Sequence, residues 1–290
     1  MYLATSPSPQ RTGAPPLRLE RIEHKVFGPG EPYTPEFVSY FADLTGQFGQ
    51  PFHEEYFTHA APNSFTGMAT EILSAAAHSE ETFDLALIVH STPDAMPTRP
   101  ACYLSRALAG NALAFALSEQ GVTAPFTAIR LAGEYAREAA FHRTLVMILD
   151  QSFLWNGAEA RLPVGTLMPG RDSAVVLVMA PDGALGPMSV RTFADVAEDE
   201  VRHLVAEQMR EFGASPLPMT AIAGVGVDHE LAVDCPIRWA AEDLPCTGGW
   251  SAFADGLPQW TRTGQRVVLV DYDPALRYLS LCSVDVPPAA

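Results

Sequence analysis

Short apolar runs alternate with amphipathic stretches along most of the chain. Continuous apolar runs of four to eight residues are typical of strands buried on both faces of a sheet. Such strands are expected at 83–91, 143–151, 173–181, 218–227, 265–273 and 278–286. Helices are expected at 34–48, 62–80, 100–110, 122–140, 195–212 and 249–261. Elements that alternate in this order predict an α/β protein with a largely parallel sheet.

The succession of helices and strands occurs twice. We therefore expect two comparable halves, at residues 17–190 and 191–290, after a flexible tail at 1–16 that is rich in Pro and Ser. The tail has no apolar segment of the kind found in export signals. No apolar run reaches the length of about 18 residues that a membrane span needs. These features predict a cytoplasmic protein that does not interact with membranes.

Charge and cysteine content narrow the function classes. The formal net charge is −16, and the 18 Lys and Arg residues are scattered. Nucleic-acid binding needs clustered basic side chains to neutralise phosphates, so it is not expected. The four cysteines form no CxxC pair, which argues against a zinc cluster and against a disulfide framework. They are Cys102, Cys235, Cys246 and Cys282.

Four stretches match known motifs in their order and spacing. They are "FDLALIVHSTPDAMPTRPACYLSRALAG" (83–110), "AFALSEQGV" (114–122), "GRDSAVVLVMAPDG" (170–183) and "TGQRVVLVDYDPALRYLSLCSVDV" (263–286). In these stretches the chain resembles the thiolase-fold condensing enzymes of the β-ketoacyl-ACP synthase III group. The resemblance implies a thiolase-like five-layer αβαβα fold with two pseudo-symmetric halves. It also implies dimers that pair edge to edge across the first half.

The same resemblance implies a catalytic triad of Cys, His and Asn. In that family a cysteine thiolate at a helix N-terminus is acylated by a thioester, and the His and Asn assist condensation. Carried over to this chain, the three positions fall on Gly121, Ala223 and Leu244. Small shifts of the alignment give Val122, Thr123, Gly224 or Asp243 instead. None of these residues can perform the role of its counterpart.

The turn between the last two expected strands, at residues 271–276, differs from the family pattern as well. Active members have a Gly-rich turn there, which lets the backbone approach the thioester. This chain has "DYDPAL", with Asp271, Asp273 and Pro274. A second resemblance, to the cysteine-less subunit of heterodimeric alkylquinolone synthases, rests on this turn and on the "CTGGW" stretch at 246–250.

Together these losses predict a non-catalytic subunit without a cofactor or a metal. Such a subunit would pair with an active, Cys-containing ketosynthase III-like homologue as a heterodimer or heterotetramer. It would shape the partner's acyl-binding site in secondary-metabolite biosynthesis of polyketide, fatty-acyl or quinolone type. Acyl-CoA or acyl-carrier protein would be engaged through the partner. A homodimer remains open as an alternative to the heterodimer.

An enzymatic alternative also remains open at this stage. An acyltransferase, decarboxylase or cyclase on the same scaffold would use Ser118 or His229. Gln120 could instead fill the former nucleophile position as a plug, with Ser118 as a turn residue.

Several other polar residues are weaker candidates. Asp228 and Glu230 flank His229 beside a strand end, where sites in α/β proteins tend to lie. Asp199 or Glu200 could face His203 on one side of a helix at metal-ligand spacing, although a charged first turn of a surface helix explains them better. The remaining candidates are Cys102, as a displaced nucleophile, and His90, for which packing is favoured over acid–base work.

Overall fold

The computed structural model describes residues 16–49, 52–58, 60–76, 81–97, 99–139, 141–154, 162–213 and 215–289. The elements up to residue 180 are β1 (Arg18–Val26), α1 (Pro35–Gln47), α2 (Glu55–Thr58), α3 (Phe65–Ala76), β2 (Leu85–His90), α4 (Pro100–Ala107), β3 (Leu113–Leu117), the 3₁₀ turn η1 (Gly121–Thr123), α5 (Ala124–Ala139), β4 (Thr144–Asp150) and β5 (Ser173–Ala180). The later elements are β6 (Ser189–Phe193), α6 (Glu198–Phe212), β7 (Met219–Ala223), β8 (Ile237–Trp239), α7 (Gly248–Thr263), β9 (Gln265–Asp273) and β10 (Tyr278–Val286).

The strands form two five-stranded sheets of the same topology. Their strand orders are β1-β5-β4-β2-β3 and β6-β10-β9-β7-β8. In each sheet two neighbouring pairs are parallel and two are antiparallel. The expectation of a largely parallel sheet is therefore wrong, because β5 and β10 return antiparallel beside β4 and β9. The strands of the first sheet lie within residues 18–180 and those of the second within 189–286, while the boundary at residue 190 stays a prediction.

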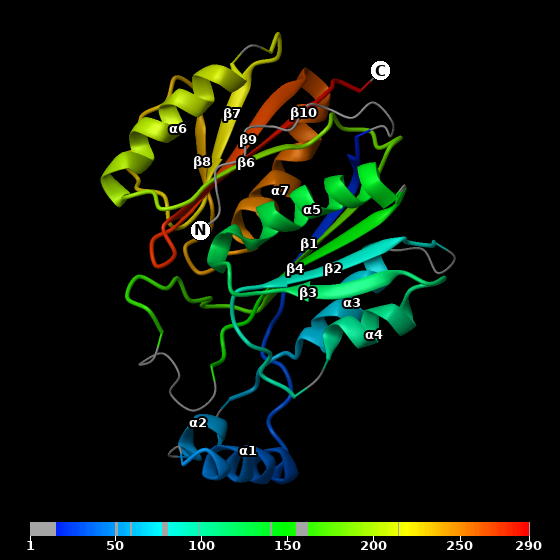
Figure 1. The fold of residues 1–290 in the computed structure, drawn as a ribbon, viewed down its shortest axis with the longest axis vertical. Helices are drawn as coiled ribbons and strands as arrows, with labels where there is room; N and C mark the ends of the chain where they lie inside the picture. Colours follow the sequence, from blue (N-terminus) through cyan, green and yellow to red (C-terminus); the bar gives the residue numbers. More distant parts are fainter. Residues whose placement is uncertain are drawn as a thin grey trace.

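The order in which helices and sheets are layered follows from three apolar cores, each of which joins helices to a face of a sheet. One core joins α5 and α7 to the inner faces of both sheets, through side chains such as Phe126, Trp250, Ile148 and Leu269. A second joins α3 and α4 to the outer face of the first sheet, and a third joins α6 to the outer face of the second. Figure 1 shows α5 and α7 between the sheets, with α6 on the far side of one sheet and α3 and α4 on the far side of the other. The layers are thus α, β, α, β, α.

Strand periodicity places three aspartates at the central layer. In β4, Val146 and Ile148 face the central core, so Asp150, two residues later, ends the strand on the same face. In β9, Leu269 faces that core, and the alternation puts Asp271 and Asp273 on its side. Both strands therefore end with a carboxylate aimed between the two halves.

The two halves differ in their outer helices. Because the strand orders match, β2, β3 and α3 correspond to β7, β8 and α6. In the first half α4 connects β2 to β3. The equivalent connection, residues 224–236, is fully described and contains no helix. In the described residues, the outer face of the second sheet is therefore covered by one helix, α6, and by the irregular segment 224–236.

Residues between β1 and α3 form a small lobe that carries α1 and α2. Figure 1 shows this lobe projecting from the body beyond the ends of β2 and β3. The segments that lead into and out of the lobe, around residues 28–30 and 61–63, are hydrogen-bonded to each other, and we call this place the neck. There the Gly30 N–H donates to the Ala61 carbonyl at 2.7 Å, and Asn63 Nδ2 donates to the Gly28 carbonyl at 2.8 Å. A Cβ on Gly30 would lie 2.4 Å from the Pro62 carbonyl oxygen, so the neck requires glycine.

The helices in the described part of the chain are too short or too polar to span a membrane.

Candidate functional site

A cluster of buried acidic and sulfhydryl side chains lies where the two halves meet, at the carboxyl ends of β4 and β9. Ligand sites of α/β proteins commonly lie at this edge of a sheet. The members are Asp150, Asp271, Asp273 and Cys246, which are 0–5% exposed. Each carboxylate accepts backbone N–H groups, which offsets part of the cost of burying it.

Asp150 holds the start of α7. Its carboxylate accepts N–H groups from Cys246 at 3.1 Å and from Thr247 at 2.8 Å, and the Thr247 hydroxyl at 2.7 Å. A carboxylate suits a helix N-terminus, where unpaired N–H groups and the helix dipole favour negative charge. Burial nevertheless raises the pKa of Asp150 to about 6, and these hydrogen bonds oppose the rise. Asp150 therefore changes its charge near neutral pH.

Asp273 occupies the equivalent place at the start of α5. Its carboxylate accepts the Val122 N–H at 3.1 Å and the Leu276 N–H at 2.8 Å. Val122 belongs to η1, which leads directly into α5. The space for this carboxylate exists because residue 121 is glycine: a Cβ there would lie 1.6 Å from Asp273 Oδ2. Gly121 also has φ +52°, a backbone conformation that favours glycine.

Asp271 fills the position next to the end of β7. A Cβ on Gly224 would lie 2.2 Å from the Asp271 carboxylate, whose Oδ1 accepts the Tyr272 N–H at 3.0 Å. Burial raises the pKa of Asp271 well above its usual range, and the nearby carboxylates of Asp273 and Asp150 add to the rise. The buried carboxyl group of Asp271 therefore favours its protonated form more than an exposed aspartate does.

Cys246 contacts Gly121, the residue to which the resemblance assigns the nucleophile position. Its Sγ lies 3.7 Å from the Gly121 carbonyl oxygen. Burial, and then the charge of Asp150, raise the pKa of Cys246 well above its usual range. The thiolate is the reactive form of cysteine, so burial and the raised pKa disfavour the reactive form of this thiol.

The three positions inferred for the family triad are distributed as follows. Gly121 lies inside the cluster, against Asp273. Ala223 ends β7 in the outer core of the second half, and the next residue, Gly224, adjoins Asp271. Leu244 is buried in the turn before α7, whereas Cys246, two residues later, contacts Gly121. The two positions that adjoin the carboxylates are both glycines.

Ser118 and Gln120 lie in the turn that joins β3 to α5, and both are partly buried. Between them, Glu119 is exposed and has φ +62°. A non-glycine residue in this conformation costs on the order of 1 kcal/mol. The turn keeps a strained backbone although its side chains include no cysteine.

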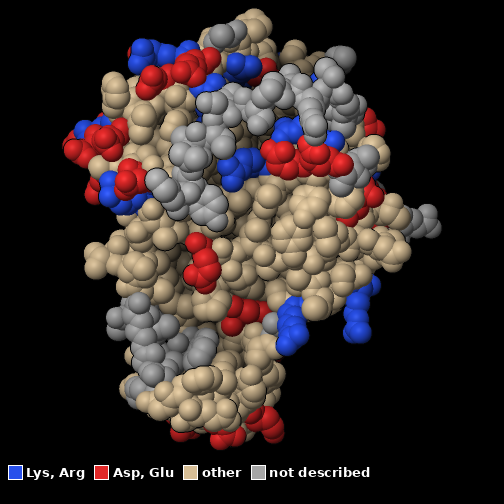
Figure 2. Space-filling view, in the orientation of Figure 1, with Lys and Arg blue, Asp and Glu red and all other residues tan. Residues whose placement is uncertain are grey.

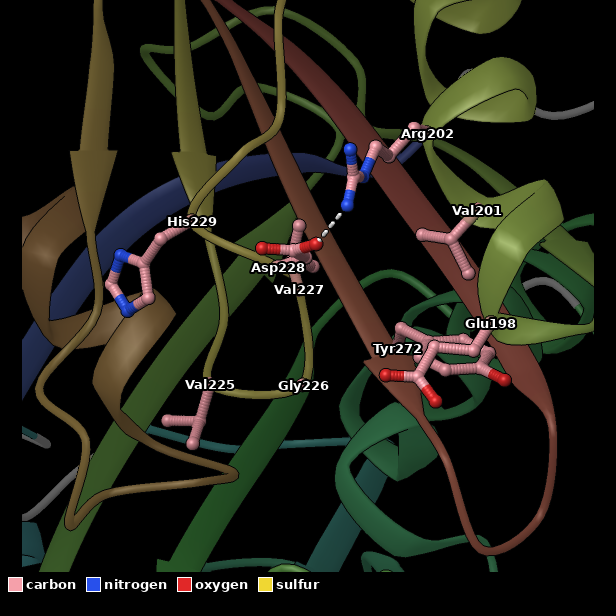
Figure 3. A pocket seen from close by; sticks show the side chains of 9 residues that line it. All are labelled: Glu198, Val201, Arg202, Val225, Gly226, Val227, Asp228, His229 and Tyr272. Atoms are coloured by element: carbon pink, nitrogen blue, oxygen red, sulfur yellow. Dashed lines mark hydrogen bonds and ion pairs between the residues drawn. The ribbon is translucent and has the colours of Figure 1, made fainter.

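His229 lies outside the cluster, beside a surface pocket of about 310 Å³ between α6 and the loop after β7. Figure 3 shows Asp228 pointing across this pocket to Arg202 of α6, at 2.5 Å, while His229 points to the other side of the loop. The His229 ring packs on Trp239 at 4.2 Å between centroids. Arg202 also pairs with Glu230, so the three charged residues near His229 form surface ion pairs.

The remaining candidates from the sequence lie outside the acidic cluster, and two of them, His90 and Glu200, have structural partners. His90 packs on Phe65, its Nδ1 lies 2.7 Å from the Thr92 carbonyl oxygen, and burial lowers its pKa. Glu200 accepts the Ala197 N–H at 2.9 Å and so caps α6. Cys102 is exposed on α4. Within the described residues, no three His, Cys, Asp or Glu side chains are arranged to hold a metal ion.

The sequence interpretation identified Asp271 and Asp273 as a change in the closing turn but missed Asp150 and Cys246. Asp150 and Cys246 are 96 residues apart in sequence, and only the docking of α7 against β4 brings them together. The alternation of β4 was the available signal, because it places a carboxylate on an otherwise apolar inner face.

Comparisons with known proteins show similarity in structure. No family model and no curated protein matches the sequence. The solved structure of ChlB3, an acyltransferase, is 15% identical with a TM-score of 0.60, over 94% of this chain and 98% of that one. AbyA1, a tetronic acid condensing enzyme, is 13% identical with a TM-score of 0.62, over 92% and 99%.

The same similarity extends to 3-oxoacyl-(acyl carrier protein) synthase III, FabH, from Pseudomonas aeruginosa PAO1. It is 16% identical with a TM-score of 0.58, over 95% of this chain and 99% of that chain. At these identities the comparisons establish the fold alone. The expected α/β fold with two pseudo-symmetric halves is confirmed, and the chain has the thiolase-like fold of the ketosynthase III-type condensing enzymes.

Proposed function

We propose that the chain is a non-catalytic ketosynthase III-like subunit. It pairs with an active, Cys-containing homologue and shapes that partner's acyl-binding site in a biosynthetic pathway of polyketide, fatty-acyl or quinolone type. The second resemblance noted in the sequence, to the cysteine-less subunit of alkylquinolone synthases, belongs to this proposal.

The proposal is supported by the surroundings of Gly121, the residue to which the resemblance assigns the family's nucleophile position. The carboxylate of Asp273 occupies the space that a side chain at this residue would need. Acyl transfer needs hydrogen-bond donors aimed at an oxygen that becomes negative. Here the Val122 N–H at the start of η1 already donates to the side chain of Asp273 and is therefore not available to a developing oxyanion.

The proposed pairing is supported by the edge of the first sheet. β3 is the last strand of its sheet and pairs with β2. Its sequence, Leu-Ala-Phe-Ala-Leu, carries no charge, and Leu113 is 43% exposed. An apolar edge strand is a template for pairing with another chain. The family resemblance implies dimers that pair edge to edge across the first half, and β3 is an edge of that half's sheet.

Intact-mass measurement tests whether the chain becomes covalently acylated. The purified chain is incubated with acetyl-CoA and octanoyl-CoA, and the active homologue serves as the positive control. We expect no added acyl mass on this chain, because its cluster thiol, Cys246, is buried and burial raises its pKa. An acyl group on Ser118 or His229 would support the enzymatic alternative and contradict the proposal.

Substitution on the edge strand tests the pairing. Leu113→Lys places a charge on β3, and the matched control, Val26→Lys, places it on β1 at the opposite edge of the same sheet, where Val26 is 38% exposed. After co-expression with a Cys-containing ketosynthase III-like homologue encoded in the same genome, we expect a 1:1 complex for the wild type and for Val26→Lys. Leu113→Lys should yield separate chains in size-exclusion chromatography with light scattering. No complex with wild-type chain, or equal loss in both variants, would exclude pairing through β3.

A further inference from the structure

The lobe that carries α1 and α2 presents an outward face of acidic and aromatic side chains. On α1, Glu36, Tyr40, Asp43 and Gln47 follow one another at spacings of four, three and four, and all are exposed. Residues at these spacings share one face of a helix. The inward face of α1 holds Phe41 and Thr45, which are buried.

Aromatic exposure in the lobe is high for a protein surface. Tyr40 is 45% exposed, Phe48 71% and Tyr56 44%. Single apolar residues on a surface are ordinary, but exposed tyrosines are enriched at sites of interaction. Tyr40 stands one turn after Glu36 and one turn before Asp43, so a carboxylate flanks its ring on each side.

The charge of this region has one sign. No Lys or Arg occurs between Lys25 and Arg99, whereas Glu31, Glu36, Asp43, Glu54 and Glu55 lie in the lobe. In Figure 2 acidic side chains gather at the free end of the lobe, and the basic side chains seen on this face lie on the body. The face of the lobe is therefore complementary to a basic surface.

The lobe is held in a fixed orientation. At the neck, Asp172 accepts Asn63 N and Nδ2, both at 2.9 Å, and the Tyr33 hydroxyl donates to the Ala95 carbonyl at 2.6 Å. Tyr33 also packs edge-on against Phe57 and Phe41. A surface that is already ordered loses little conformational entropy when it binds.

We propose that the outward face of α1, together with Tyr56 of α2, is a docking surface for a protein partner that presents Arg and Lys side chains. A guanidinium over the Tyr40 ring would gain a cation–π contact and charge-assisted hydrogen bonds to Glu36 and Asp43. Arginine fits this arrangement better than lysine, because its planar group stacks on a ring and still donates sideways. The proposal does not depend on the pairing through β3.

Binding of a hexa-arginine peptide to the full chain tests the proposal at 150 mM salt. Glu36→Lys/Asp43→Lys should weaken binding at least about tenfold, and Tyr40→Ala, which changes no charge, about threefold. The matched control is Asp182→Lys/Asp234→Lys, which changes the net charge equally at exposed positions outside the lobe. Hydrogen exchange should show protection within residues 35–58 on binding.

Three results would overturn the proposal. Equal weakening by the control pair would mean attraction by the overall negative charge. Unchanged binding by Tyr40→Ala would remove the role of the ring. Binding of free spermine as tight as that of the peptide, with the same dependence on the variants, would indicate a small-cation site. A circular dichroism spectrum and melting temperature like those of the wild type establish for each variant that the fold is intact.

Discussion

Position 121 has two requirements that only glycine meets. Its φ of +52° lies in the left-handed region, and its missing side chain gives room to the Asp273 carboxylate. Gly133, within α5, is different: a Cβ there would meet no atom within 4 Å. The two glycines, one on each side of the start of the same helix, therefore give a matched pair of substitutions.

We expect Gly121→Ala to lower the free energy of unfolding by at least about 2 kcal/mol, because the new methyl group displaces a buried carboxylate and the backbone is strained. Gly133→Ala should raise it by about 0.5–1 kcal/mol, as alanine favours a helix interior. Urea unfolding measures both values. A neutral Gly121→Ala would mean that Asp273 does not occupy this space.

At the scale of elements, α7 depends on close packing between its own turns. A Cβ on Gly256 would lie 2.2 Å from the ring of Trp260, one turn later, and Trp260 is 3% exposed. Gly249, near the start of the same helix, has its nearest atom, Leu269 Cδ2, at 3.9 Å. The indole thus lies flat on the glycine, which brings the ring into the central core.

Gly256→Ala should destabilise the protein by about 1–3 kcal/mol, because an added methyl group in a filled core forces the indole out of place. Gly249→Ala should be neutral or stabilising by less than about 1 kcal/mol. Thermal unfolding followed by Trp fluorescence reports both the stability and the new environment of the indole. Equal effects of the two substitutions would contradict the packing described for Trp260.

The elements that the sequence predicts well are those with continuous apolar runs. All six expected strands and all six expected helices form, with ends shifted by a few residues where those ends are described. The expected helix ends at 77–80 and 140, and residues 1–15 of the expected tail, lie outside the described residues. β3 was missed because its five-residue run is short and lies directly before the turn at 118–120. β1 was missed because a charged edge strand lacks such a run. For β6 and β8, pairing with a neighbouring strand is the main stabilisation, and pairing is a long-range property.

At the scale of the whole molecule, the acidic cluster couples stability to pH. Burial raises the pKa of Asp150 to about 6 from 3.8, so the folded state binds a proton more tightly than the unfolded state does. This stabilisation is complete below about pH 3.8 and is lost as the pH rises through about 6. The difference is worth about 3 kcal/mol for the single group.

We therefore expect the free energy of unfolding to fall between pH 4.5 and pH 7.5. Asp150→Asn should lose much of this dependence, since the amide oxygen can still accept an N–H and carries no charge. Asp182→Asn, at an exposed position, is the control and should retain it. Urea unfolding across the pH range measures the slope, and a wild-type protein that is most stable at pH 7.5 would contradict the raised pKa.

Only part of the candidate site could be predicted from the sequence. The sequence shows directly that "SEQGV" at 118–122 contains no cysteine and that "DYDPAL" at 271–276 is acidic. That Asp273 fills the space at Gly121 could not be predicted, because it depends on the contact between η1 and β9, 151 residues apart. Local patterns predict the elements, whereas the side chain that occupies a given space is decided by tertiary packing.

The two helix starts in the cluster have a consequence for folding cooperativity. Asp150 ends a strand of the first half and caps the helix of the second, while Asp273 ends a strand of the second half and caps the turn into the helix of the first. If either half opened alone, both carboxylates and both helix ends would lose their partners at once. The halves should therefore exchange their amide hydrogens as a single foldon, with α5 and α7 reaching the same opening free energy. Neither half expressed alone would be a native-like domain.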